Sequence, residues 1–383
     1  MATILYLYAQ PYRAGSDHAR RTVQMLSLLK ACGHAVDVLT LSGGDVWPEG
    51  LVRQRYLTSR VPFVKTLPFY GRGFRRFWAG VVMFFAALRL AFRERYDAVH
   101  CSDRAIRTGG FLSWLFRKPF IFEWHATHSG HDLVKWLSRR SRRFRRSINM
   151  IFSDFPYPSS RFRQIGVYGR IAILPLLPSP TIEPQSLPAV RMYSETQNFR
   201  LVAFSATEDL QDFSPLCHVL PTLLERYPLH LSLIGATPKA MERLRRQLQA
   251  QLGDLALRVA LRPALYCTDE VLRATREADL VYLSAVPGPL PPPLLIDLMA
   301  ARKALLVIQC PAFQTLLSPT NATLVPYDAQ AIGNAIVHHL QRPLLCAEHA
   351  QAAYDTIHTE RNARVVVEEV RRCYELALKE MSV

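Results

Sequence analysis

Short apolar runs alternate with amphipathic segments of helical length along most of the chain. In the first half, runs that suit buried strands cover residues 4–9, 35–41, 97–102, 119–125, 149–155 and 171–178. Between the first two runs, Ala19, Val23 and Leu26 recur at helical spacing, and Gly33 is placed to end that helix. A strand, a helix and a second strand in this order predict a βαβ unit and therefore a parallel sheet.

The second half repeats this alternation, with strand-like runs at residues 201–205, 229–235, 257–262, 279–284, 304–308 and 322–326. Residues 179–198 separate the halves and are rich in proline and polar side chains without any period, which is typical of a linker. We therefore expect an α/β protein with two doubly wound, Rossmann-like domains over residues 1–178 and 199–345. Helical residues 346–383 are expected to pack back across a cleft between these domains.

Charge is distributed unevenly over the 383 residues. The chain is 49% hydrophobic, enough to fill two cores, which excludes an intrinsically disordered protein. Residues 1–180 hold 28 Lys and Arg against 10 Asp and Glu, whereas the remainder holds 19 against 21. This asymmetry predicts an anionic partner for the first half: a nucleic acid, an anionic membrane or a phosphorylated substrate.

The cysteines and the apolar runs indicate a compartment. Seven scattered cysteines without metal-ligand spacing are typical of the reducing cytosol and predict no metal site. No apolar run reaches the ~18 residues of a spanning helix, and the start of the chain has no basic segment like that of a signal peptide. We expect a cytoplasmic protein that is soluble or lies on a membrane.

Five stretches carry a resemblance to a known family: CGHAVDVLTL (32–41), YDAVHCSD (96–103), KPFIFEWHATH (118–128), LHLSLIGATPK (229–239) and ADLVYLSAVPGPLPPPLLIDLMAARKALLVI (278–308). In order and spacing they resemble the family 4 retaining glycosyltransferases. That family has the GT-B fold, in which two Rossmann-like domains face a cleft. The resemblance implies a nucleotide-sugar donor as substrate, a glycan or lipid-linked acceptor, and neither a cofactor nor a metal.

The resemblance also implies site residues. Asp297 corresponds to the second of two glutamates that the family separates by seven residues, and it would accept hydrogen bonds from the ribose. His125 occupies the family's histidine position and would contact the transferred sugar or the acceptor. The implied donor site comprises Gly15, Gly235, Arg262, Ser284, Leu294, Leu295 and Asp297, and the implied acceptor site comprises Asp103, Arg104 and His125.

Each of these residues also has a purely structural interpretation. Asp297 is favoured near a helix start by the helix dipole. His125 suits a hydrogen-bonded position in a domain interior, and Asp103 suits the cap of the helix that begins near residue 105. The two glycines fit tight turns without any ligand.

Two departures from the family bear on activity. Pro289 stands where the first glutamate is expected, within a proline-rich stretch whose residues 291–293 lack backbone donors for phosphate. The loop at 205–214, where the family has a basic pair, contains three acids and no Lys or Arg. Arg262 or Lys239 would have to supply the positive charge instead. A GT-B scaffold that has lost donor chemistry and serves as an assembly partner is therefore an alternative.

Six arginines lie within residues 139–146, and RGFRRFW (72–78) adds basic and aromatic residues. We expect these segments to contact the anionic inner face of a membrane, through Arg75, Arg76, Arg139, Arg140, Arg142, Arg143, Arg145 and Arg146. A solvated surface is the structural alternative, and nucleic-acid binding is a third hypothesis that no recognisable module supports. The resulting prediction is a peripheral glycosyltransferase of envelope polysaccharide biosynthesis.

Overall fold

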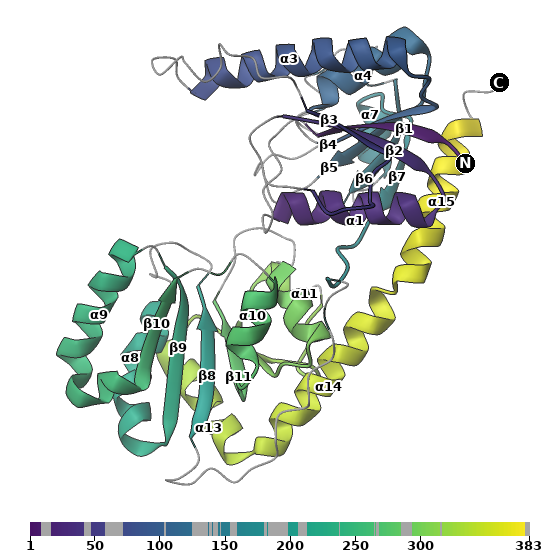
Figure 1. Cartoon of the computed structure of the whole chain (residues 1–383). Helices are drawn as coiled ribbons and strands as arrows, with labels where there is room; N and C mark the ends of the chain where they lie inside the picture. The colour runs from purple at the N-terminus through teal and green to yellow at the C-terminus, as the bar shows by residue number, and fades with distance from the viewer. Residues whose placement is uncertain are drawn as a thin grey trace. The chain divides into compact units, whose positions relative to one another are not determined.

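A computed structural model describes most of the chain: residues 1–8, 17–41, 47–57, 72–102, 105–124, 137, 140, 145, 147–153, 159–179, 182, 198–205, 213–236, 238–263, 265, 268–284, 293–314 and 316–379. The chain divides into two compact units (Figure 1). Unit 1 comprises Met1–Leu176 together with Ala363–Val383, and unit 2 comprises Leu177–Asn362.

Unit 1 is built on a seven-stranded sheet in which all neighbouring strands run parallel. Its strands are β1 (Thr3–Tyr8), β2 (Ala35–Thr40), β3 (Gln54–Leu57), β4 (Ala98–Ser102), β5 (Phe120–Trp124), β6 (Ile148–Ser153) and β7 (Arg170–Ile173). They are ordered β3-β2-β1-β4-β5-β6-β7, so the direction of winding reverses between β1 and β4. This order is that of a doubly wound fold.

Helices cover both faces of the unit 1 sheet (Figure 1). They are α1 (Asp17–Ala31), α3 (Arg72–Arg93), α4 (Ile106–Phe116), α7 (Ser159–Gln164) and α15 (Ala363–Lys379). Alternate side chains of each strand point to opposite faces. Leu5, Val99 and Phe122 therefore share one core with Met83 and Leu112 of α3 and α4. The opposite face lies beneath α1 and α15, which contact each other.

Unit 2 contains a second parallel sheet, ordered β10-β9-β8-β11-β12-β13. Its strands are β8 (Phe199–Phe204), β9 (Leu229–Ala236), β10 (Val259–Pro263), β11 (Leu280–Leu283), β12 (Leu305–Ile308) and β13 (Thr323–Val325). Its helices are α8 (Ser214–Arg226), α9 (Pro238–Leu252), η4 (Gly253–Arg258), α10 (Thr268–Thr275), α11 (Pro293–Ala300), α12 (Pro311–Gln314), α13 (Ala329–Gln341) and α14 (Pro343–Glu360). The winding reverses between β8 and β11.

The predicted fold class of two doubly wound α/β domains is confirmed. The expected C-terminal segment 346–383, however, is divided between the units. Its first part belongs to α14, which begins at Pro343 and packs on α11 and α13 in unit 2. Its second part is α15, which packs on α1 and β6 in unit 1 and buries Val366, Val370 and Cys373. The first division of the chain falls at residue 176, two residues before the expected one.

Two local predictions differ from the structure. The strand expected at 171–178 ends at Ile173, and the short edge strand β3 was not expected, because QRYL has no apolar alternation. In the part of the chain that the structure describes, no helix combines the length and the hydropathy that crossing a membrane requires.

Candidate functional site

The carboxyl ends of the unit 2 strands form one row across the sheet. Arg262 of β10 pairs in register with Ile234 of β9, and Ile234 pairs with Phe204 of β8. Phe204 in turn pairs with Leu283 of β11. Ligands of open α/β sheets bind beyond such carboxyl ends, at the point where the winding reverses. The residues that follow this row, beside the β8–β11 reversal, are therefore the candidate site.

Gly235 is required where β9 ends. Its φ of +132° lies in a region that residues with a Cβ rarely adopt, and a Cβ at this position would lie 2.8 Å from Cβ of Ser205. The backbone N–H of Ser205 donates to the carbonyl of Ile234 at 2.9 Å, which holds the two strand ends together. The glycine thus has a structural reason, and it also leaves the edge of the sheet without a side chain.

Ser284 follows β11, on the other side of the β8–β11 reversal from Gly235. It is buried, and its Oγ donates to the carbonyl oxygen of Phe204 at 3.3 Å. Ser205 and Gly235 are small and half-buried, so this edge of the sheet presents mainly backbone, whereas Ser284 is buried. The predicted donor residues Gly235 and Ser284 lie at the ends of β9 and β11, on either side of β8 and about 10 Å apart at the usual spacing of strands.

Asp297 lies on α11, the helix that follows β11. Its side chain is buried, and Oδ1 accepts a hydrogen bond from the backbone N–H of Ser179 at 3.2 Å. The carboxylate therefore fastens the first residues of unit 2 to α11. Leu295 is fully buried and Leu294 is half-buried, so these two predicted donor residues belong largely to the packing of the helix.

Basic residues stand farther from the reversal point. Arg262 is exposed and lies two strands from Phe204, about 10 Å across the sheet at the usual spacing of strands. Lys239 is exposed in the first turn of α9, directly after β9. Either side chain would have to extend along the edge of the sheet to meet a phosphate at the β8–β11 reversal.

Several predicted positions fall outside the described residues: Gly15, Asp103, Arg104, His125, Arg139, Arg142, Arg143 and Arg146, with Pro289 and residues 206–212. Arg75 and Arg76 belong to α3, although their side chains are not described. Strands β4 and β5, which precede Asp103 and His125, pair in parallel and end at Ser102 and Trp124. Arg140 and Arg145 are half-buried, and the guanidinium of Arg145 donates to the carbonyl of Arg140.

Residues 18–175, the greater part of unit 1, match the model of the glycosyl transferase 4-like domain. These residues therefore carry a glycosyl transferase 4-like domain, and the chain as a whole has the GT-B fold. No curated protein sequence is significantly similar to this chain.

Solved structures of GT-B proteins resemble this chain over nearly its whole length. Sucrose-phosphate synthase from Thermosynechococcus elongatus is 15% identical with a TM-score of 0.65, and the match covers 98% of each chain. Anabaena HepE, solved in complex with UDP-glucose, is 15% identical with a TM-score of 0.65, over 98% of this chain and 100% of HepE. The α,α-trehalose-phosphate synthase from Burkholderia xenovorans, in complex with glucose-6-phosphate, is 12% identical with a TM-score of 0.62, over 97% and 100%. At these identities the likeness concerns the fold.

The sequence patterns did not predict a buried polar network in unit 1. The hydroxyl of Tyr6 donates to Oε2 of Glu123 at 2.8 Å, and Nε2 of His100 lies 3.1 Å from Oε1 of the same carboxylate. Nδ1 of His100 shares a hydrogen bond with the hydroxyl of Tyr374 on α15. The network therefore joins β1, β4 and β5 to the C-terminal helix.

Burial keeps the two hydroxyls of this network protonated. It raises the pKa of Tyr6 and of Tyr374 well above the usual value, and the negative charge of Glu123 adds to the shift in both. The sequence contains a signal for this network: an imidazole and a carboxylate stand inside two apolar strands, AVHCS and FIFEW, and buried charges need partners.

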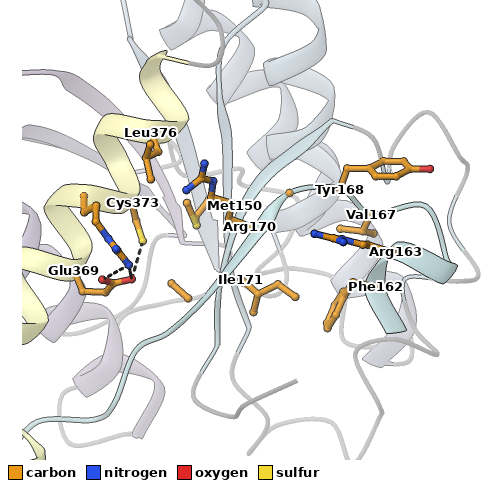
Figure 2. Close-up of a pocket in the computed structure, with 13 residues that line it drawn as sticks. Met150, Phe162, Arg163, Val167, Tyr168, Arg170, Ile171, Glu369, Cys373 and Leu376 are labelled. Atoms are coloured by element: carbon orange, nitrogen blue, oxygen red, sulfur yellow. Dashed lines mark hydrogen bonds and ion pairs between the residues drawn. The ribbon is translucent and has the colours of Figure 1, made fainter. Parts of the chain in front are cut away.

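A cavity of about 410 Å³ in unit 1 lies between edge strand β7, α7 and α15 (Figure 2). Three arginines line it, Arg163, Arg170 and Arg372, and Arg372 is paired with Glu369 at 2.8 Å. Burial raises the pKa of the neighbouring Cys373 to about 12, so its thiol is unreactive at neutral pH. Because its lining includes Tyr168 and Gly169, which precede β7, this cavity is not at the carboxyl ends of the strands.

Among the residues that the structure describes, no three His, Cys, Asp or Glu side chains are grouped so that they could hold a metal ion.

Proposed function

We propose that the protein transfers a hexose-type sugar from a nucleotide-sugar donor to a glycan or lipid-linked acceptor, with retention of configuration, in envelope polysaccharide biosynthesis. The observation that supports this most is the edge formed by Ser205, Gly235 and Ser284 at the strand reversal of unit 2. A nucleotide can approach the backbone closely there, and α11 with Asp297 follows directly.

The two units then have different tasks. In unit 2, Asp297 accepts hydrogen bonds from the ribose, and Arg262 extends toward the diphosphate. In unit 1, Asp103, Arg104 and His125 bind the acceptor and the transferred sugar. Catalysis in this scheme comes from positioning and from polarising the leaving diphosphate, without a metal or a bound cofactor. The arginine-rich unit 1 lies at the anionic inner face of the membrane, where a lipid-linked acceptor resides.

Nucleotide binding tests the donor site. We expect UDP, GDP or ADP, or one of their sugar conjugates, to raise the melting temperature of the protein. Arg262→Ala should weaken this binding about tenfold, because a charge-assisted hydrogen bond is lost. Arg200→Ala is the matched control, since Arg200 is the second residue of β8, near the opposite end of the strand, and is paired with Glu277. If none of these nucleotides stabilises the protein, the proposed transfer is wrong.

A catalytically inactive scaffold is the second candidate function. It is favoured by Pro289 in place of the first carboxylate and by the carboxylate of Asp297, which is buried and already bonded to Ser179. Asp297→Asn separates the two functions, because its amide oxygen still accepts from Ser179 while the charge is removed. A transferase should lose turnover at an unchanged melting temperature. A scaffold should support glycan production in cells as well as the wild type does.

A further inference from the structure

Helices α3 and α4 of unit 1 expose a continuous set of large apolar side chains. Their exposed fractions are 71% for Phe92, 63% for Phe85, 48% for Trp114, 40% for Leu115 and 39% for Phe111. We call these five residues the aromatic surface. Exposed apolar groups of this size that cluster usually mark an interaction site, whereas single ones are ordinary.

Ring contacts join the two helices into one surface. The ring of Phe84 lies 5.1 Å from that of Phe111, and the ring of Phe92 lies 5.1 Å from that of Phe116. Phe111 and Trp114 are 5.7 Å apart along α4. These edge-on and tilted contacts fix the rings in place, so the surface is preformed.

The core does not require these side chains. Helix α3 already buries Met83, Ala87 and Leu90 against the sheet, and α4 buries Ile106 and Leu112. Both helices lie on the sheet face opposite to α1 (Figure 1). The aromatic surface therefore forms a second apolar stripe, which points away from the sheet.

The exposed charges around the aromatic surface are basic. Arg89, Arg93, Arg107 and Arg117 are all exposed on or beside the two helices. Of the acids, Glu94 lies 3.8 Å from Nε of Arg93. Asp97 accepts a hydrogen bond from the N–H of Thr3 at 2.8 Å, so its carboxylate is engaged within the sheet.

Arg140 lies close to the basic residues of α4. Burial lowers the pKa of Arg140, and the charge of Arg107 on α4 lowers it further. The two guanidinium groups are therefore close enough to repel each other. A partner rich in negative charge would relieve this repulsion.

We propose that the aromatic surface of α3 and α4 inserts into the interfacial layer of an anionic lipid bilayer, with the surrounding arginines on the phosphate headgroups. Phe and Trp side chains together with Arg are the residues that bind this layer. A symmetric contact between two copies of the chain would instead bring like charges together. The inference deepens the membrane association of the proposed function and names the surface that provides it.

Vesicle flotation of the full chain tests the proposal. We expect binding to phosphatidylcholine vesicles that contain phosphatidylglycerol and much weaker binding to phosphatidylcholine alone. The triple variant Phe85→Ser, Phe92→Ser, Trp114→Ser should reduce binding at least about tenfold, because it removes three of the inserted side chains. The matched control is Leu257→Ser, Leu344→Ser, Val365→Ser, which replaces equally exposed apolar residues elsewhere and should bind as the wild type does.

Tryptophan quenching gives a second measurement, which does not require the triple variant to fold. Brominated acyl chains should quench the fluorescence of the wild type, and Trp114→Phe should reduce that quenching, because Trp114 is 48% exposed on the aromatic surface whereas Trp47 and Trp124 are buried. Equal vesicle binding by the triple variant and the wild type would overturn the proposal. So would a wild-type dimer that the triple variant dissociates in sedimentation. Neither assay involves sugar transfer, so failure of the donor-site assignment would leave both results unaffected.

Discussion

The two sheets share a strand order but differ in where they place polar side chains. In unit 1, the inner strands β1, β4 and β5 bury Tyr6, His100 and Glu123 beneath α15. In unit 2, the corresponding inner strands β11 and β12 read LVYL and LLVI, without an imidazole or a carboxylate. Besides the buried Tyr282 of β11, the unit 2 sheet has hydroxyls at its carboxyl edge, on Ser205 and Ser284.

This difference shows that two sheets with the same strand order can use polar side chains differently: inside the core to fix the packing of a helix, or at the edge of the sheet. A buried network has a strict geometry, so it specifies which helix packs on a sheet and where. In unit 1 this helix is α15. It lies at the end of the chain, far in sequence from the strands it packs on, so its position on the sheet is not set by a short connection. In unit 2 the hydroxyl of Ser284 bonds to the backbone of Phe204 and so holds neighbouring strand ends together at the carboxyl edge. All five tryptophans of the chain precede residue 177, so tryptophan fluorescence reports on unit 1 alone.

The largest expected effect is that of Glu123→Ala. The substitution removes the acceptor of Tyr6 and the carboxylate beside His100, and leaving these two buried polar groups without their partner costs about 3–5 kcal/mol together. We expect the free energy of unfolding of unit 1 to fall by this amount in urea titrations followed by tryptophan fluorescence. Glu123→Gln keeps one acceptor oxygen and should lose less. An unchanged urea midpoint for the alanine variant would show that the network is not a source of stability.

Gly235→Ala should have the next largest effect, and in the other unit. A Cβ would lie 2.8 Å from Cβ of Ser205, and φ is +132°, so both contact and backbone strain cost about 2–3 kcal/mol together. The unfolding of unit 2, followed by circular dichroism, should shift while the tryptophan transition stays in place. Gly333→Ala on α13 is the control. Its Cβ would meet Val219 at an ordinary 3.4 Å, so helix propensity should stabilise that variant by about 0.5–1 kcal/mol.

The alternation of apolar runs and helices was enough to predict the fold. The prediction from this alternation was wrong where neighbouring residues show no periodic pattern. Examples are strand β3 and the break between α14 and α15. The pattern of α14 continues past Glu360 without Gly or Pro, so the change of unit at Asn362 had no local signal.

The candidate site was predicted less completely than the fold. Gly235 and Ser284 were named as donor residues, and the structure places them on the two strands that flank β8, where Gly235 contacts Ser205 and Ser284 bonds to Phe204. Asp297 was named from the resemblance, but its bond to Ser179 joins residues 118 positions apart and could not be read locally. The contact of His100 with Tyr374 spans 274 positions and was missed for the same reason.

Lys303 offers a pH test of unit 2. Burial lowers its pKa from 10.5 to about 8, and Nζ donates to the carbonyl of Arg276 at 3.1 Å. Between these two pKa values the unfolded chain still holds a proton that the folded state has released. Unit 2 should therefore become more stable as the pH rises through this window, by up to about 1.4 kcal/mol per pH unit.

The variant Lys303→Met isolates this contribution from other groups that titrate in the same range. Below pH 8 the variant should be more stable than the wild type, because no cation is buried. The difference in the free energy of unfolding should then shrink as the pH approaches the ordinary pKa of lysine. A difference that stays constant with pH would show that Lys303 does not lose its proton in the folded state.

Tyr374→Phe should have the smallest effect and compares the two units most directly. It removes one hydroxyl from the buried network and leaves the ring contacts of α15 with Phe152 and His34, so the expected loss is about 1 kcal/mol. The tryptophan-detected urea midpoint should fall accordingly. Tyr282→Phe makes the same chemical change at a fully buried position of the unit 2 sheet, and it should leave that midpoint unchanged because unit 2 contains no tryptophan. If Tyr374→Phe also leaves the midpoint unchanged, the packing of α15 depends on its apolar face, and the network does not select the docking site of that helix.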